Sequence, residues 1–146
     1  MESTSGEYAR FLAYGNQLIE IHIGLRDMLA DLREGIVPEA DLGRHCLAFC
    51  AAVTRHHTGE DTQVFPLLAA RHPELRTFLT ELERDHQVIA GLLTRVSHLA
   101  GRPAELPAEL DGIAAVLETH FLGEEKRLVA VLNAIDPSEG LTGLTA

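Results

Sequence analysis

The stretch His56-His57-Thr58-Gly59-Glu60-Asp61 returns 64 residues later as His120-Phe121-Leu122-Gly123-Glu124-Glu125. At the same offset His22 falls on His86, so each half of the chain reads His, then 33 residues, then His-x-x-x-Glu, without a gap. The apolar positions around these residues repeat as well. An internal repeat of this kind indicates that the chain is built from two copies of one supersecondary unit.

Helical periodicity on both sides of the repeated stretch predicts four helices. Apolar residues recur at spacings of three and four, and Gly or Pro stands at each break. The predicted helices cover about 8–33, 42–70, 75–99 and 107–135. Pro66 is expected to kink or split the second of them. Because short connections make neighbouring helices antiparallel, the sequence predicts an all-α, antiparallel up-down four-helix bundle made of two helix hairpins.

Length and charge narrow the class of protein. The 146 residues suit one domain, which we expect over 1–135, with the Gly-, Ser- and Thr-rich residues 136–146 as a C-terminal tail. A formal net charge of -10 without a basic stripe argues against a nucleic-acid partner. No apolar run approaches the roughly 20 residues that span a bilayer, and no secretory leader is recognisable, so we expect a cytoplasmic protein. Cys46 and Cys50 are interpreted as reduced core thiols.

The repeated His and Glu residues lie on the predicted buried faces of the helices. A His and a Glu four residues apart share one helix face, about 6 Å apart along the axis. Phe49, Val53, His56 and Glu60 follow one another at helical spacing, so the polar pair points toward the core. Burying such groups among Leu and Val requires compensation, either from metal ions or from a metal-free network in which every lone pair is satisfied.

Six residues in register across a repeat favour metal ions over the metal-free network. The predicted metal ligands are His22, His56, Glu60, His86, His120 and Glu124. A single zinc ion is saturated by four ligands, whereas this set offers six and includes carboxylates that can bridge. The sequence therefore predicts two ions, and no catalytic or cofactor-binding residue beyond this metal centre.

Charge balance favours iron for both ions. Four neutral imidazoles and two carboxylates carry -2, so two ferrous ions (+4) leave +2, and an oxo dianion that bridges them balances the oxidation of both to the ferric state. The predicted cofactor is therefore two iron ions, oxo- or hydroxo-bridged when oxidised. We assign His22 and His56 to one iron and His86 and His120 to the other, with Glu60 and Glu124 bridging. A solvent-derived bridge then leaves the sixth position of each iron for a small molecule.

These residues resemble the hemerythrin-like family, also called HHE cation-binding domains, over almost the whole chain. The matching elements are Ile21-His22-x-x-Leu25-Arg26, His56-His57-x-x-Glu60-Asp61-x-x-x-Phe65-Pro66, Asp85-His86 and His120-Phe121-x-x-Glu124-Glu125. The resemblance implies a non-haem di-iron centre that meets dioxygen, hydrogen peroxide or nitric oxide. Members of the family serve as oxygen carriers, sensors, stress-defence proteins and catalase-like enzymes.

The third predicted helix departs from the family's oxygen carriers, which place two His four residues apart there. The positions four residues to either side of His86 are Leu82 and Ala90, so the fifth His is missing. This departure argues against reversible oxygen carriage and favours reaction with peroxide or nitric oxide. His57 and Asp61, whose repeat mates are Phe121 and Glu125, are interpreted as outer hydrogen-bonding partners or surface residues rather than ligands.

Three functions remain open from the sequence. The first is a di-iron protein that binds or decomposes a small oxidant in oxidative or nitrosative stress defence, with catalase-like turnover if it is an enzyme. The second is an oxygen or iron sensor, or iron-binding module, that acts through a protein partner. The third is a di-iron oxidase of an organic substrate, which requires a cavity opening toward the metals.

Overall fold

Four long helices, one of them interrupted, make up most of the regular structure in the described part of the chain. The computed structural model describes residues 13–145, so the part of the first predicted helix over 8–12 lies outside the described residues. The long elements are α2 (Tyr14–Arg33), α3 (Leu42–Gly59) with its continuation α4 (Phe65–Arg71), α5 (Arg76–Leu99) and α6 (Leu106–Asn133). Short 3-10 turns occupy Glu39–Asp41 (η1), Pro73–Leu75 (η3) and Pro137–Glu139 (η4).

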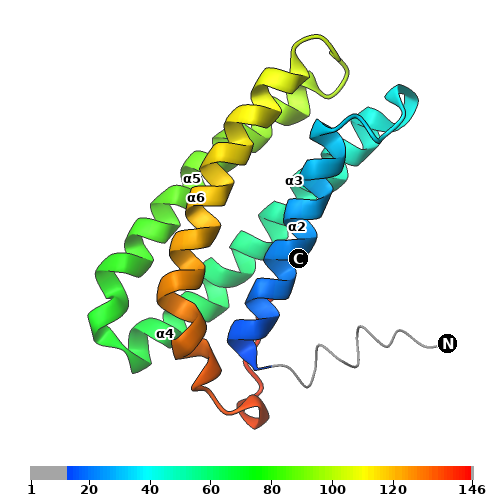
Figure 1. Cartoon of the computed structure of the whole chain (residues 1–146). Coiled ribbons are helices and arrows are strands. Elements are labelled where there is room, and N and C mark those ends of the chain that lie inside the picture. Colours follow the sequence, from blue (N-terminus) through cyan, green and yellow to red (C-terminus); the bar gives the residue numbers. More distant parts are fainter. Residues whose placement is uncertain (1–12, 146) are drawn as a thin grey trace, which may run out of the picture.

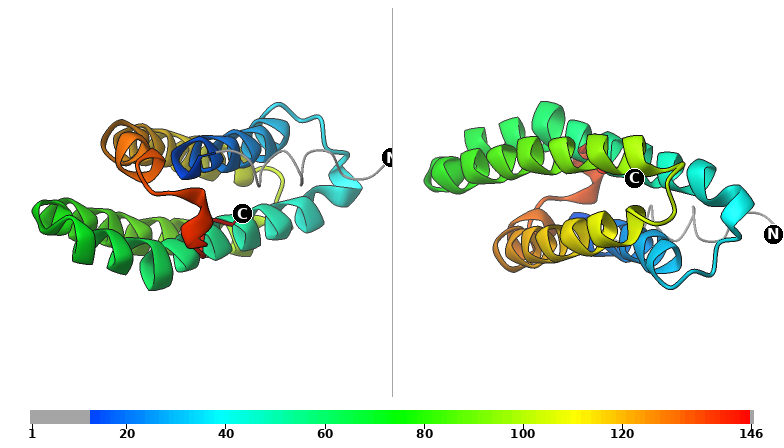
Figure 2. Two further views of the ribbon diagram at one scale, coloured as in Figure 1. Left: turned by 90° about the horizontal axis from the view of Figure 1, so that it is seen from below. Right: turned by 90° about the horizontal axis from the view of Figure 1, so that it is seen from above.

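The helices run up and down in two layers (Figures 1 and 2). In one layer α2 lies beside α6, and in the other α3 and α4 lie beside α5. The connections between successive helices are short, so neighbours are antiparallel. The prediction of an all-α, up-down four-helix bundle is confirmed. Within residues 13–145, no helix combines the length and the apolar character needed to cross a bilayer.

The second predicted helix is interrupted at the place where its metal-site residues end. A π-helical turn, η2 (Glu60–Val64), separates α3 from α4, and the N–H of Phe65 donates to the carbonyl of Glu60. Pro66 follows directly, and its ring lacks an N–H and clashes with the carbonyl of the preceding turn. The repeat mate of Pro66 is Ala130, and α6 continues through it without a break. Pro66 therefore accounts for the split that the sequence predicted.

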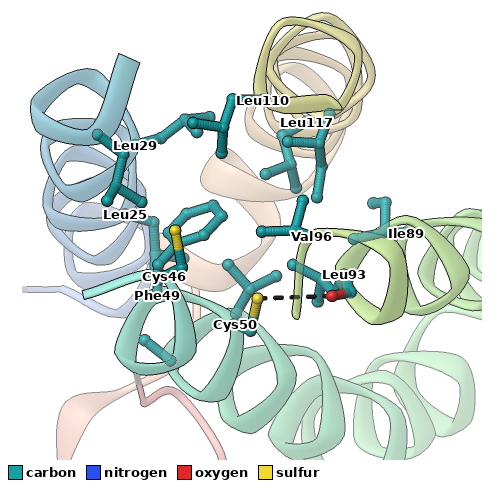
Figure 3. Close-up of a cluster of buried hydrophobic side chains, with 14 of the residues drawn as sticks. Leu25, Leu29, Cys46, Phe49, Cys50, Ile89, Leu93, Val96, Leu110 and Leu117 are labelled. Atoms are coloured by element: carbon teal, nitrogen blue, oxygen red, sulfur yellow. Dashed lines mark hydrogen bonds between the residues drawn. The ribbon is translucent and has the colours of Figure 1, made fainter. Parts of the chain in front are cut away.

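Two apolar clusters fill the bundle, one toward each end. The first cluster joins all four helices, as the side chains labelled in Figure 3 show: Leu25, Leu29, Cys46, Phe49, Cys50, Ile89, Leu93, Val96, Leu110 and Leu117. The second cluster contains Tyr14, Leu18, Val64, Phe65, Leu68, Leu75, Leu79, Leu82, Leu128, Leu132 and Ile135. On each long helix the predicted ligands lie between residues of the two clusters, so the polar layer is enclosed on both sides by apolar side chains.

The two cysteines belong to the first cluster as free thiols. Cys46 is fully buried, and the Cys50 thiol donates a hydrogen bond to the backbone carbonyl of Leu93 at 3.6 Å (Figure 3). Burial raises the pKa of both thiols, which keeps them protonated and poorly nucleophilic. Their interpretation as core thiols is confirmed.

The chain beyond α6 returns to the bundle and packs on it. Gly140 has a φ of 68°, a left-handed conformation that suits glycine and turns the chain after η4. The Tyr14 hydroxyl donates to the carbonyl of Pro137 and accepts from the N–H of Leu141, both at 2.9 Å. Residues Leu141–Thr145, here called the crossing segment, run between the two helix layers toward α3 (Figure 2, left, red).

Candidate metal centre

A layer of four imidazoles and two carboxylates crosses the bundle at one level. Each of these six side chains is at most 5% exposed. They are the six ligands predicted from the sequence: His22 on α2, His56 on α3, Glu60 at the start of η2, His86 on α5, and His120 and Glu124 on α6. The fold thus brings together in space every residue of the predicted set.

The inner nitrogen atoms of the imidazoles meet in two pairs. The Nε2 atoms of His22 and His56 lie 3.2 Å apart, and those of His86 and His120 lie 3.1 Å apart. These are the two pairs that the sequence assigned to separate ions.

The two carboxylates connect the imidazole pairs. Glu60 lies 3.5 Å from the Nε2 of His56 and 3.3 Å from the Nε2 of His86. Glu124 lies 3.2 Å from the Nε2 of His120 and 3.4 Å from the Nε2 of His22. Each glutamate therefore spans from one pair to the other, which is the position a bridging ligand requires. The six side chains form a closed ring of donor atoms.

The outer nitrogen of each imidazole in the ring is held by an oxygen atom that can only accept. The Nδ1 contacts are His22 with Glu125 at 2.6 Å, His86 with Asp61 at 2.7 Å, His120 with Asp85 at 3.1 Å and His56 with the backbone carbonyl of Thr145 at 2.9 Å. Carboxylates and carbonyls accept, so each Nδ1 carries the proton. In the neutral imidazole the Nε2 lone pair then faces the centre of the ring.

Facing lone pairs require a positive charge between them. Burial lowers the pKa of His56 to about 4 and that of His86 to about 3, so one imidazole of each pair is neutral near pH 7. Two neutral Nε2 atoms at hydrogen-bond distance repel each other, unless the second ring of the pair takes an extra proton or a cation binds both. Neutral imidazoles aimed at one point are the form that metal ions bind.

The glutamate oxygens also indicate a site for cations at the ring. The Oε1 atom of Glu60 and both carboxylate oxygens of Glu124 are buried and accept no hydrogen bond from the described residues. Burial raises the pKa of Glu60 well above its ordinary value, and the neighbouring Glu124 carboxylate adds to this effect. Buried polar atoms without partners are rare and costly in proteins. A pair of cations at the ring would satisfy these oxygens and the imidazole lone pairs together, so the residues present fit the di-metal centre that the sequence predicts.

The sequence left His57 as either an outer hydrogen-bonding partner or a surface residue. It is 5% exposed, which excludes the surface, and its Nε2 atom makes no hydrogen bond to the described part of the chain. Possible ligand atoms form two groups of four, and the atoms of each group lie within 4.8 Å of one another. One group contains His57, Glu60, His86 and His120, and the other contains His22, His56, Glu60 and Glu124. His57 therefore adds a third imidazole to the side of His86 and His120.

Stacking contacts relate His57 to its repeat mate. The ring of His57 stacks on His86 with centroids 3.8 Å apart and planes 10° apart, and the ring of Phe121 stacks on His22 at 4.0 Å and 17°. The two halves thus share one aromatic position, which one half fills with Phe and the other with His. The apolar mate Phe121 was the signal in the sequence that position 57 is buried.

Asp61 and Glu125, which are repeat mates, occupy equivalent places as outer partners of His86 and His22. Here the interpretation of Asp61 as an outer hydrogen-bonding partner is confirmed. The same oxygen of Glu125 also accepts from Arg26 at 3.0 Å, and Arg26 pairs in addition with Glu118. The two carboxylates fix the ring orientation of their imidazoles and increase their basicity as ligands.

A pocket between α3 and α5 reaches this layer from the surface. Its volume is about 180 Å³, and its lining includes His57, Asp61 and His86. A larger hollow of about 400 Å³ between α5 and α6 is lined by Asp85 and His120 among others. There the Asp85 carboxylate already accepts from the Nδ1 of His120. The pocket beside His57 is therefore lined by a histidine whose Nε2 atom makes no hydrogen bond to the described residues.

Comparison with known proteins gives one family. The model of the Hemerythrin HHE cation binding domain matches residues 16–132, a range that contains all six predicted ligands and His57. No curated protein and no solved structure matches the chain.

Proposed function

The chain belongs to the hemerythrin HHE cation-binding domain family, and from this premise we propose that it is a non-haem di-iron protein that binds or reacts with a small oxidant. Hydrogen peroxide, dioxygen and nitric oxide are the candidates, in oxidative or nitrosative stress defence. The observation that carries the proposal is the closed ring of buried His and Glu donors, with a small pocket at one side.

Each ion has its own set of ligands in this proposal. His22 and His56 would hold one iron, and His86 and His120 would hold the other, joined by His57 from the neighbouring helix. Glu60 and Glu124 lie between the two sets and would bridge them. Only one of the two sets includes a third imidazole, so the two ions would differ in their ligands.

The side chains around the ring prepare it for small-molecule chemistry. When bound, two iron ions supply a redox couple and open coordination positions. Glu125, Asp61 and Asp85 hold the outer Nδ1 protons of three imidazoles, which keeps the Nε2 lone pairs directed inward. The two apolar clusters exclude bulk water from both sides of the layer, and this raises the strength of every electrostatic interaction in it.

The pocket beside His57 suits a small molecule rather than an organic substrate, whereas the hollow of about 400 Å³ lined by His120 is large enough for either. The volume of the pocket beside His57, about 180 Å³, is below the roughly 300 Å³ at which pockets for drug-sized ligands begin. Peroxide, dioxygen and nitric oxide have two heavy atoms each and fit such a space. An organic oxidase remains an outcome of the test rather than the proposal.

Metal analysis of the aerobically purified chain tests the proposal. We expect two irons per chain and absorption bands of a ferric pair that shift when azide is added. Peroxide removal and nitric oxide binding are then measured with the iron protein and with a zinc-loaded sample, which controls for chemistry that does not need redox. Fewer than two irons, or a di-iron protein inert toward all three small molecules, would falsify the proposal. The variant His86→Ala is expected to lose at least one iron.

A further inference from the structure

One ring histidine lacks the carboxylate partner that the other three have. Three of the Nδ1 atoms donate to the side chains of Glu125, Asp61 and Asp85, whereas the Nδ1 of His56 donates to the backbone carbonyl of Thr145. The repeat explains the difference, because the position equivalent to Asp85 in the first half is Ile21. His56 has no acid at that place and takes its outer hydrogen bond from the crossing segment.

The crossing segment reaches His56 over a contact between two glycines. Gly59 follows His56 by three residues on α3, and a Cβ atom there would come within 2.1 Å of the carbonyl oxygen of Gly143. A Cβ on Gly143 would meet the carbonyl oxygen of Gly59 at 2.6 Å, and Gly143 has a φ of 101°. A side chain on either residue would therefore separate the segment from the helix.

Apolar packing holds the rest of the segment in place. Leu141 and Leu144 pack against the second cluster, and the N–H of Leu141 donates to the Tyr14 hydroxyl. The contact with His56 is thus the end of a docked stretch of chain.

We propose that the crossing segment Leu141–Thr145 is a positioning element of the metal centre, which holds His56 through the carbonyl of Thr145 and makes the two metal positions unequal. The proposal rests on the di-iron function proposed above. A carboxylate partner raises the basicity of an imidazole ligand more than a neutral carbonyl does. The ion held by His22 and His56 is therefore the more weakly bound, and its binding depends on the docked segment.

The repeat supplies a matched pair of variants for the test. Gly59→Ala places a methyl group against Gly143, whereas Gly123→Ala changes the repeat mate, where an added Cβ meets no atom within 4 Å. Both substitutions replace glycine by alanine between the His and the Glu of a repeated pair, and neither replaces a predicted ligand. Hydrogen exchange of residues 141–145 then reports whether the segment has left the bundle, and we expect faster exchange in Gly59→Ala alone. Gly143→Val, which clashes from the other side, serves as a second displacing variant.

Ferrous iron is titrated anaerobically against a chromophoric chelator in each variant. We expect the unchanged chain and Gly123→Ala to bind two ions alike. In Gly59→Ala one ion keeps its affinity, and the other binds about 10- to 100-fold more weakly, which is the usual effect of losing an outer partner of a metal ligand. Adding Ile21→Asp to Gly59→Ala places a carboxylate at the position equivalent to Asp85 and is expected to restore the lost affinity.

A metal-free measurement separates this proposal from the proposed function. The ¹⁵N shifts of His56 in the apo chain report which ring nitrogen carries the proton, and we expect the Nδ1–H form in the unchanged chain and a mixture in Gly59→Ala. An unchanged chain that binds fewer than two ions contradicts the proposed function, and the tautomer shifts still decide whether the segment positions His56. A displaced segment with two ions at unaltered affinity and an unaltered tautomer would overturn the positioning role alone.

Discussion

The ring of His57 lies parallel to that of His86, with centroids 3.8 Å apart, and its Nε2 atom is buried without a hydrogen bond. Its repeat mate Phe121 stacks on His22 in the same way but offers no ligand atom. One aromatic position thus has a structural role in one half of the bundle and the means to bind a metal in the other. The difference leads to the first prediction.

The substitution His57→Phe is expected to weaken iron binding and to stabilise the metal-free protein. Phe fits a position that Phe121 fills in the other half, so the fold is retained. Removing a buried nitrogen that lacks a partner increases the free energy of unfolding of the apo chain by about 1–3 kcal/mol. Losing a ligand on the side of His86 and His120 lowers the affinity for one iron. Urea unfolding and metal titration measure the two effects, with the exposed His45→Phe as control. Equal iron affinity in both variants would exclude His57 as a ligand.

Glu60→Gln separates metal binding from stability. In the metal-free chain burial raises the pKa of Glu60 well above its ordinary value, which favours the protonated form, and Gln resembles that form in shape and charge. The free energy of unfolding of the apo chain is therefore expected to change by less than about 1 kcal/mol, because no buried charge is removed. Iron content is expected to fall below two per chain, since Glu60 contacts His56 and His86 from opposite sets. The exposed Glu20→Gln is the control, and a normal iron content in Glu60→Gln would contradict a bridging role.

Asp61→Asn and Glu125→Gln remove the outer carboxylates of His86 and His22 while keeping the side-chain shape. Each change is expected to lower the affinity for one iron by about 10- to 100-fold, because an amide stabilises the imidazole ligand less than a carboxylate does. Chelator competition on the ferrous protein measures the loss. Asp111→Asn, which alters a surface pair with Arg33, is the matched control. Affinities equal to that of the control would show that these carboxylates do not support the centre.

Acid is expected to destabilise the metal-free protein. Burial lowers the pKa of His56 to about 4, that of His86 to about 3 and that of His57 further. Below about pH 6.5 these three imidazoles therefore bind protons in the unfolded chain and stay neutral in the folded chain. Glu60 and Asp61, whose pKa values are raised, act in the opposite direction with one proton each. Glu124, whose pKa is lowered, adds to the effect of the three imidazoles, and His120, whose pKa is raised, is mostly protonated in both states below about pH 6. The free energy of unfolding of the apo chain is therefore expected to fall as the pH drops from about 6 to about 4.5.

Urea unfolding of the chelator-treated chain at several pH values measures this slope. His57→Phe removes one of the three imidazoles, so its free energy of unfolding is expected to depend less steeply on pH over the same interval than that of the unchanged chain. A stability of the unchanged chain that rises as the pH falls would contradict the assignment of neutral buried imidazoles.

The first apolar cluster is expected to contribute much of the free energy of unfolding. Phe49 is fully buried there, and Phe49→Ala is predicted to lower the free energy of unfolding by about 3–5 kcal/mol. Leu47, two residues earlier on α3, is 53% exposed, and Leu47→Ala is expected to cost less than about 1 kcal/mol. Chemical unfolding of both variants provides the comparison, and similar losses would show that the cluster is not the main core.

The sequence by itself determined the helices, the bundle and the six residues of the ring. These features depend on periodicity along single helices, where a His and a Glu four residues apart necessarily share a face. The 64-residue repeat placed the two halves in register, so the same level of the bundle could be assigned to His22, His56, His86 and His120. Pro66 marked the interruption of the second helix for a purely local reason, its missing N–H.

Only the tertiary structure decided the surroundings of that ring. His57 lies about 100° around α3 from His56, so helical spacing placed it off the ligand face, and only the packing of α3 against α5 showed that its ring stacks on His86. The contact of His56 with Thr145 joins residues 89 positions apart through a backbone carbonyl. A carbonyl is present in every residue and leaves no mark in a sequence, so this partner of His56 could be found only where the folded chain brings the two together.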